Sequence, residues 1–276
     1  MPEAYLITRG HERKLEYDFL GPVPPAFWWS PLSERRLVDL NQAEVMAHGD
    51  GRSLSVLVSG IPSARLDFVG RGIRHTLVVD GLHDDAELAL ELVRAGLAAA
   101  GRESLGRRLD EAFDEQTIVA VRTGASSAAV VSERLTRALL AGPGPGAPGA
   151  TAGGPLPADQ AGSWAGPAGD DDARALFLAR VRALAAGAPG FACTSCLAQT
   201  ATAIEADIEG LPGTQWVLVT GGRLAEVVPL GKALPAITGT RSSLSTRLAT
   251  RPRAVAATGA TVTALIVIVI VILLLL

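Results

Sequence analysis

The sequence predicts an α+β body, with an α/β body as the alternative, followed by one C-terminal transmembrane helix. Three observations support this prediction. Short segments in the first eighty residues alternate apolar and polar side chains, which is typical of antiparallel strands. Longer segments with apolar residues at helical spacing follow between residues 84 and 208. The segment 254–276 contains no charged side chain.

The first eighty residues are predicted to form an antiparallel meander. Five short segments there are rich in β-branched, aromatic or alternating apolar residues: residues 5–8, 15–19, 53–61, 65–69 and 73–79. The first two segments flank a polar turn, which favours a hairpin. The last two are joined across Gly70-Arg71-Gly72, whose glycines permit a tight turn.

Helical spacing dominates from residue 84 onward. Asp84-Asp85-Ala86-Glu87 has the pattern of an N-cap with a capping-box-like glutamate, and apolar residues follow at helical spacing. Further helices are predicted over 104–113 and 126–140, with a short strand over 117–122 between them. Past Asp172 the pattern predicts two helices, the second over 196–208, and then a hairpin of strands over 215–220 and 224–230.

A segment rich in glycine and proline divides the chain. Residues 142–172 begin with Gly142-Pro143-Gly144-Pro145-Gly146 and end with Asp170-Asp171-Asp172. Such a composition buries too little apolar surface to offset the entropy of ordering, so a linker or long surface loop is predicted. The expected domains are therefore a strand-rich and then helical lobe over 1–141 and a smaller α/β lobe over 173–231.

The C-terminal segment is predicted to be a transmembrane anchor. As a helix, residues 254–276 would be about 34 Å long at about 1.5 Å per residue, and a bilayer core is about 30 Å thick. The isoleucine and valine content also fits a buried strand, and a tail that folds back to shield a pocket is a further alternative. A lipid bilayer is accordingly the first expected partner.

A basic segment precedes the uncharged one. Residues 232–253 contain no acidic residue and five cations: Lys232, Arg241, Arg247, Arg251 and Arg253. A segment rich in cations beside an apolar span tends to remain on the cytoplasmic side of the membrane, and its cations attract anionic lipid headgroups. Met1-Pro2-Glu3-Ala4-Tyr5 does not begin a signal peptide, so the body is expected to face the cytoplasm. Abundant arginine and alanine with almost no lysine are typical of GC-rich bacterial genomes, so the inner membrane is the expected location.

Charge and cysteine usage exclude some classes of protein. The whole chain has net charge −3, and the five membrane-proximal cations contribute +5, so the residues up to Leu230 carry −8. An acidic body argues against binding to nucleic acid. Two cysteines in 276 residues give no disulfide framework, which agrees with a reducing cytoplasm.

A first candidate site surrounds the Gly70-Arg71-Gly72 turn. Four basic or ionisable residues lie near it: Arg65, Arg71, Arg74 and His75. Glycine N–H groups and guanidinium groups together suit phosphate oxygens, so the expected ligand is a nucleotide or a phosphorylated partner. The alternative is the solvent face of a hairpin whose charges pair across strands. No third glycine follows to complete a dinucleotide-binding fingerprint.

The thiol motif Cys193-Thr194-Ser195-Cys196 is a second candidate. At a helix N-terminus the dipole lowers a thiol pKa, which would suit a redox or thiol switch at Cys193 and Cys196. The preceding residues 188–192 do not form the apolar strand of thioredoxin-like folds. Two semi-buried residues capping a helix are the alternative. Half of a metal site is a further alternative, but zinc would need two more ligands and all four histidines lie in the first half of the chain, so no metal ligand is predicted.

A third candidate is an aromatic cluster in the proline-rich segment 22–31, formed by Phe27, Trp28 and Trp29. Such a cluster either closes one end of the core or forms an exposed apolar surface for a protein partner.

Catalytic motifs are missing from the sequence. It contains no Gly-x-Ser-x-Gly, Walker, His-Glu-x-x-His or EF-hand pattern, and no catalytic residue or cofactor is predicted. The expected function is ligand sensing or partner binding at a membrane, in signalling, stress or phage defence, with self-association or a protein partner. A related form is an effector that acts on the membrane itself. The alternative is a membrane-tethered enzyme that uses the thiol pair or an arginine-lined phosphate site.

Overall fold

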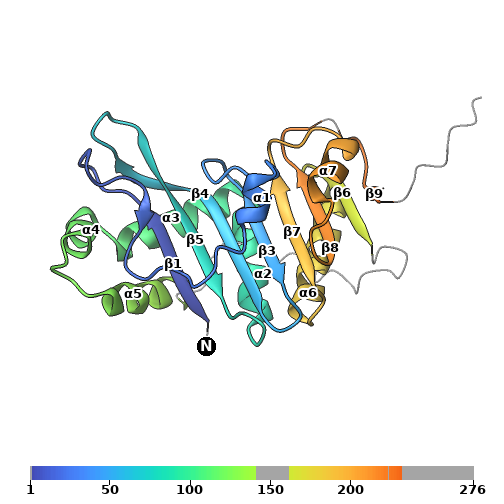
Figure 1. The fold of residues 1–276 in the computed structure, drawn as a ribbon. Helices are drawn as coiled ribbons and strands as arrows, with labels where there is room; N and C mark the ends of the chain where they lie inside the picture. Colours follow the sequence, from blue (N-terminus) through green and yellow to red (C-terminus); the bar gives the residue numbers. More distant parts are fainter. Residues whose placement is uncertain (1, 141–161, 223, 232–276) are drawn as a thin grey trace, which may run out of the picture. The chain divides into compact units, whose positions relative to one another are not determined.

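The computed structural model describes residues 2–140, 162–222 and 224–231. These residues form a mixed α+β body with a nine-stranded sheet and seven helices (Figure 1). No helix among them is long and apolar enough to cross a membrane. The predicted basic segment 232–253 and the predicted anchor 254–276 lie outside the described residues.

The sheet has the strand order β2-β1-β5-β4-β3-β7-β8-β6-β9. Its strands have these bounds: β1 (Glu3–Thr8), β2 (Asp18–Phe19), β3 (Val45–Gly49), β4 (Leu54–Leu66), β5 (Gly72–Asp80), β6 (Ser163–Pro167), β7 (Gly190–Ser195), β8 (Thr214–Val219) and β9 (Val228–Leu230). The helices are α1 (Ser30–Glu34), α2 (Ala86–Leu97), α3 (Ala99–Ala112), α4 (Glu115–Arg122), α5 (Ala128–Leu140), α6 (Asp171–Ala185) and α7 (Ala201–Ile208).

The first half of the chain forms the antiparallel part of the sheet. Strands β3, β4 and β5 follow one another as a meander, and β1 pairs with the outer side of β5. The sequence predicted two strands over 53–61 and 65–69, but β4 is one strand. Its register to β5 shifts between Val58 and Ile61 and again between Pro62 and Leu66. These irregularities bend the strand without ending it, which the apolar pattern does not reveal.

The second half adds the parallel part of the sheet. Strands β7, β8 and β6 run in one direction, with α6 and α7 as crossover helices. Asp170 caps α6 by accepting hydrogen bonds from the N–H groups of Asp172 and Ala173. Strand β9 was expected to form a hairpin with β8, but it pairs with β6 at the sheet edge.

The two predicted lobes share this one sheet. Strand β3 pairs with β7, with Met46 opposite Cys193 and Gly49 opposite Gly190. The N–H of Val45 also donates to Oγ1 of Thr194 at 2.8 Å. Strands from both sides of the predicted boundary therefore belong to one sheet, and the described part of the predicted linker 142–172 contains β6 and the start of α6.

Further elements differ from the sequence-based prediction, which contains no strand at β3 and no helix at α1. Residues 117–122, predicted as a strand, lie in α4, because Asp114 caps this helix by accepting from the N–H of Thr117. Its short apolar run does not distinguish strand from helix. The helix predicted over 196–208 begins only at Ala201. Residues 190–195, for which the sequence predicts no strand, form β7.

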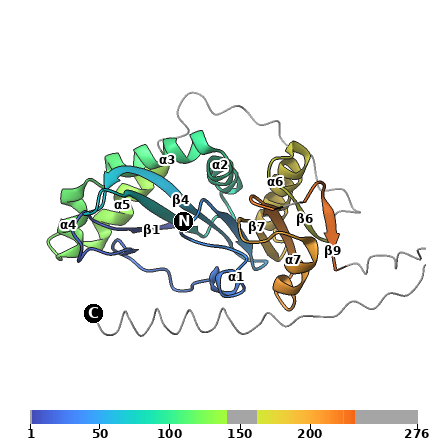
Figure 2. The ribbon, with the colours of Figure 1, turned by 90° about the horizontal axis from the view of Figure 1, so that it is seen from above.

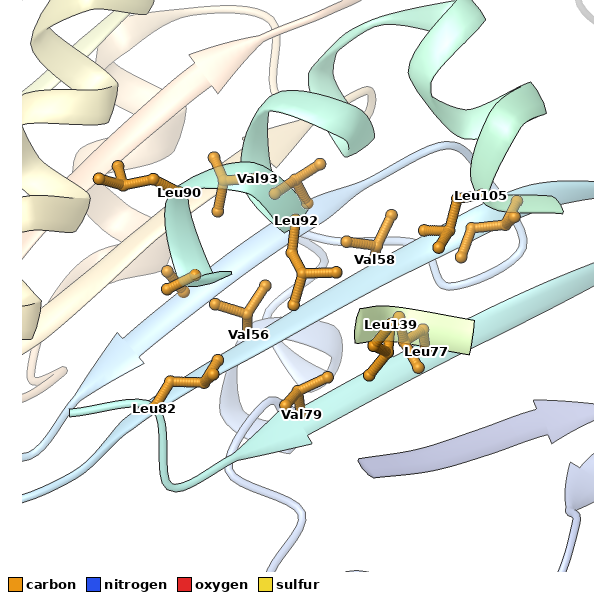
Figure 3. Packing of buried hydrophobic residues seen from close by; sticks show 14 of the residues in the cluster. Val56, Val58, Leu77, Val79, Leu82, Leu90, Leu92, Val93, Leu105 and Leu139 are labelled. Atoms are coloured by element: carbon orange, nitrogen blue, oxygen red, sulfur yellow. The ribbon is translucent and has the colours of Figure 1, made fainter. Parts of the chain in front are cut away.

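Helices cover both faces of the sheet, as Figure 2 shows from above. On one face α2, α3, α5 and α6 pack against the strands, and Figure 3 shows Leu92 of α2 pointing toward Val56 of β4. On the other face, α1 and α7 cover a second cluster that contains Trp29, Leu57 and Phe191. Burial on both sides explains why the central strands are apolar throughout.

Helix α3 approaches β4 very closely at Gly106. A Cβ atom at this position would lie only 1.9 Å from the carbonyl oxygen of Pro62. Only glycine allows this approach, so any side chain at position 106 would force α3 away from β4.

Candidate functional site

The β4–β5 hairpin extends beyond its neighbouring strands. The pairing of β3 with β4 stops at Val58, and that of β1 with β5 stops at Thr76, whereas β4 and β5 remain paired out to Leu66 and Gly72. Figure 1 shows this hairpin beside the loop that joins β1 to β2. His11 Nδ1 lies 3.0 Å from the carbonyl oxygen of Leu66, so the loop contacts the hairpin directly.

Asp67 closes the turn of the hairpin. Its Oδ1 accepts hydrogen bonds from the N–H groups of Val69 (3.0 Å) and Arg71 (2.9 Å). Gly70 has φ of +80°, which glycine adopts without strain. Burial would raise the pKa of Asp67, but these hydrogen bonds and the Arg71 guanidinium outweigh it, so the pKa is lowered. The turn therefore holds a carboxylate at its centre.

Asp110 of α3 braces the hairpin from the side. Its carboxylate accepts hydrogen bonds from Oγ of Ser63 (2.5 Å) and the N–H of Ala64 (2.7 Å), and it lies 3.0 Å from Nε2 of His75. Burial opposes ionisation, but these partners dominate and lower the pKa of Asp110 to about 2. One carboxylate thus ties both strands of the hairpin to a helix.

Arg65 and His75, two of the predicted ligand-binding residues, are used inside this brace. Arg65 donates to Glu115 (3.1 Å) and to Oγ1 of Thr8 (3.0 Å), and its Nε lies 3.5 Å from Asp110. His75 is fully buried, with Nδ1 2.9 Å from Oγ1 of Thr8. Burial lowers the pKa of His75 although Asp110 opposes the shift, so the neutral ring is favoured.

Arg71 and Arg74, the other two predicted residues, lie at the surface instead. Arg71 donates from Nε to Asp67 at 3.1 Å, and its side chain is 71% exposed. Arg74 is exposed and donates from Nη1 to the carbonyl of Asn41 at 2.9 Å. The structure therefore separates the four residues into an inner pair and an outer pair.

Arg9 belongs to the same region but was not among the predicted residues. It is 4% exposed, and its guanidinium carbon lies 5.5 Å from the ring centre of Tyr17 and 5.7 Å from that of Phe68. Nη1 lies 3.4 Å from Asp67 and 3.7 Å from Glu16, whereas Nε and Nη2 have no hydrogen-bond partner among the described residues. In the sequence Arg9 begins a polar turn, and nothing there indicates that it is buried.

The end of the hairpin exposes large apolar side chains. Leu66 is 53% exposed, Phe68 42% and Val69 56%, and Tyr17 of the adjacent loop is 45% exposed. The N–H of Arg74 donates to the hydroxyl of Tyr17 at 3.0 Å, which fixes the loop to the hairpin. These four side chains, Tyr17, Leu66, Phe68 and Val69, are called the apolar tip below.

The thiol pair lies elsewhere, at the carboxyl end of β7. Cys193 is inside the strand and Cys196 follows it, so neither is at the N-terminus of α7, contrary to the geometry that a thiol switch required. Both thiols are free. Burial raises the pKa of Cys193 strongly and, with Glu44 nearby, raises the pKa of Cys196 to about 12. The protonated thiol is therefore the favoured form at both positions.

Glu44 is the acidic partner of this end of β7. It is fully buried, accepts from the N–H of Cys196 at 2.8 Å, and accepts from the hydroxyl of Thr194. Burial raises the pKa of Glu44, although these hydrogen bonds oppose the shift. Glu44 and Thr194 are 150 residues apart, so local sequence patterns do not place them together.

The aromatic cluster is mainly a part of the core. Trp29 is 5% exposed, and Trp28 donates from Nε1 to Asp80 at 3.1 Å while its ring stacks on His48 at 5.6 Å. Only Phe27 is widely exposed, at 49%. The cluster closes the second face of the sheet, and its candidate docking role falls to Phe27 alone.

A polar row lies beneath these tryptophans. His48 of β3 lies opposite Ser55 of β4, and the Ser55 side chain is hydrogen-bonded to Asp80 of β5. Burial raises the pKa of Asp80 and lowers that of His48, so both charged forms are disfavoured. Among the described residues, no group of three or more His, Cys, Asp or Glu side chains is arranged to hold a metal ion.

Known proteins give no further assignment of these sites. Searches of protein-family models, curated proteins and solved structures find no match to this chain.

Proposed function

We propose that the chain is a membrane-attached binding module that engages a partner through the apolar tip. The observation that carries the proposal is the combination of four exposed apolar side chains with a buried network that holds them at the end of a projecting hairpin. Exposed apolar clusters of this kind are typical of interaction surfaces.

The support makes the tip a preorganised surface. Asp110, Arg65 and His75 link the hairpin to α3 and to β1, and Arg9 lies under the rings of Tyr17 and Phe68. Ordering a flexible loop on binding would cost conformational free energy, and a braced hairpin reduces that cost. This arrangement supports recognition by the tip.

The chemistry of the other candidate residues supports binding over catalysis. The two thiols favour the protonated form, which is a poor nucleophile. Arg65 and His75 are hydrogen-bonded within the protein, so neither offers its full set of donors to a phosphorylated ligand. The membrane-tethered enzyme is therefore the less favoured of the two hypotheses.

The sequence supports attachment to a membrane. Residues 254–276 are uncharged and follow a basic segment, which favours an apolar anchor with the body on the cytoplasmic side. The module would then act where the anchor holds it, as a sensor or adaptor. An effector that disrupts the membrane is a form of the same proposal in which the anchor segment is also active.

Membrane fractionation tests the attachment. The full chain should sediment with bacterial membranes, and a chain that ends at Arg253 should remain in the soluble fraction. Culture viability, followed in parallel, separates the two forms of the proposal: toxicity of the full chain alone indicates an effector, and harmless membrane association indicates an adaptor or sensor. Recovery of both chains in the soluble fraction would refute the attachment.

Substitutions in the tip test the binding role. The double substitution Leu66→Ser with Val69→Ser should abolish the effect of the full chain on culture viability. It should leave the chain in the membrane fraction. Val23→Ser is the matched control, because Val23 has the same 56% exposure as Val69. An unchanged phenotype of the tip variant, at an unchanged protein level, would refute this role.

A further inference from the structure

We infer that the partner of the apolar tip is an anionic phospholipid surface. The inference extends the proposed function and rests on it, because the predicted anchor would bring the body to a bilayer. It adds a second, independent membrane contact made by the folded body.

The shape of the hairpin suits insertion into the headgroup region. Beyond Val58 and Thr76 the two strands have no other strand beside them among the described residues, so the turn stands clear of the sheet. Its outermost apolar residues, Leu66, Phe68 and Val69, are all more than 40% exposed. Interfacial binding increases with the apolar area that enters the acyl boundary, and aromatic rings favour that depth.

Exposed cations lie near these apolar side chains, together with exposed Glu12, Glu16 and Asp18 of the adjacent segment. Arg71 is on the turn, Arg74 is on β5, and Arg13 and Lys14 are on the adjacent loop, all four exposed. The hairpin segment 63–75 carries net charge +2 with neutral histidine, whereas the adjacent segment 9–18 is neutral because its three acidic residues balance its three cations; the residues up to Leu230 carry −8. An apolar tip on a basic hairpin, within an otherwise acidic body, matches an anionic lipid surface in both respects.

Arg9 supplies a second observation that indicates a ligand. Its buried guanidinium has two nitrogen donors, Nε and Nη2, without a hydrogen-bond partner among the described residues. A buried donor without an acceptor is costly, so the site gains when an acceptor arrives. Phosphate oxygens are strong acceptors for guanidinium donors, and Arg9 lies directly under two side chains of the tip, Tyr17 and Phe68.

A fluorescence experiment tests this contact on the full chain. An environment-sensitive probe is attached at Val69→Cys, or at Val23→Cys as the control, in a Cys196→Ser background. The remaining Cys193 is 1% exposed and should not be labelled. Each labelled protein is mixed with phosphatidylcholine vesicles or with vesicles of equal parts phosphatidylglycerol and phosphatidylcholine, and flotation is measured beside emission wavelength and acrylamide quenching.

The expected result is a blue shift and protection from quenching at position 69, but not at position 23, and only with phosphatidylglycerol. Flotation with an unchanged probe at position 69 would overturn the lipid contact and leave the attachment by residues 254–276 standing. If the protein floats with neither kind of vesicle, both the lipid contact of the tip and the attachment by residues 254–276 are overturned. A blue shift at position 69 without lipid, increasing with protein concentration, would overturn the inference in favour of self-association.

Arginine substitutions test the electrostatic part with a matched control. Arg71 and Arg137 have side chains 71% and 74% exposed, and each pairs with an acidic residue four positions away. Arg71→Gln should weaken the vesicle contact reported by the probe at position 69 about fivefold, which is the effect of losing one basic residue near an anionic surface. Arg137→Gln should leave it unchanged. Equal effects of both substitutions, or none at Arg71, would contradict a specific contact by the tip.

Discussion

Replacing Asp110 with asparagine should release the hairpin from α3. The substitution keeps the size of the side chain but removes the charge that lies beside Arg65 and His75. An amide also offers one acceptor oxygen where the carboxylate uses two, for Ser63 and for the N–H of Ala64. Both strands of the hairpin would lose part of their attachment to the helix.

The magnitude follows from the pKa of Asp110. Lowering it from 3.8 to about 2 means that the folded protein stabilises the carboxylate relative to the unfolded chain. That difference corresponds to about 1–2 kcal/mol of unfolding free energy at neutral pH, the lower end allowing for screening by water at a side chain that is 16% exposed. The pKa is depressed, so the contribution is complete above about pH 4 and disappears as the pH falls toward 2.

Denaturant unfolding at a series of pH values measures this contribution. Asp110→Asn should be about 1–2 kcal/mol less stable than the natural protein at pH 7, and the two curves should converge below pH 4. Amide hydrogen exchange should increase first in residues 61–75. Asp84→Asn is the control, because Asp84 is 89% exposed, and it should change stability by less than about 0.5 kcal/mol. Equal stability of Asp110→Asn and the natural protein at pH 7 would refute the reasoning.

Three other substitutions or reagents test separate parts of the structure. Glu44→Gln should gain stability relative to the natural protein as the pH rises above 4.5, because the raised pKa makes ionisation of buried Glu44 unfavourable in the folded state. In denaturant unfolding, the difference in unfolding free energy between the two proteins should change by at most about 1.4 kcal/mol per pH unit. Parallel plots of unfolding free energy against pH would contradict the prediction. Alkylation of Cys196 by iodoacetamide at pH 8 should be at least about a hundredfold slower in the folded than in the unfolded protein, since a pKa of about 12 leaves little thiolate. Mass spectrometry follows the two rates, and equal rates would show that the folded protein presents an accessible thiolate. Gly106→Ala should lower the unfolding free energy by about 3 kcal/mol or more, because its Cβ would overlap the carbonyl of Pro62. A Cβ at Gly72 would enter open space, so Gly72→Ala should be nearly neutral. Similar melting temperatures of the two variants would contradict this prediction.

Regular patterns made parts of the fold predictable. Alternating and apolar segments indicated β1, β4 and β5 but not β3, whose five residues end in a glycine-rich turn, and the acidic N-terminal turn with helical spacing indicated α2. Strand β6 could not be found in the same way. Its Ser163–Pro167 segment is short and follows many glycines and prolines, and it is ordered by pairing with β8 and β9. Tertiary pairing of this kind overrides local composition.

The candidate site was only partly predictable for a related reason. The basic residues around Gly70-Arg71-Gly72 were visible in the sequence, but their use was not. Whether Arg65 contacts a ligand or Asp110 depends on how α3 packs against β4. The partners Arg9 and Asp110 are 58 and 43 positions from Asp67, and no local spacing connects them with the turn. Side chains from distant elements must be assembled by the fold before their chemistry can be assigned.

The pairing of β3 with β7 has a consequence for synthesis of the protein on the ribosome. Val45 and Thr194 are 149 residues apart, so the whole antiparallel half emerges before β7 exists. During that interval β3 is an apolar edge strand with unpaired backbone groups, which is a template for intermolecular pairing. Nascent chains halted before residue 190 should therefore depend on chaperones and aggregate readily, whereas chains that include β7 should not.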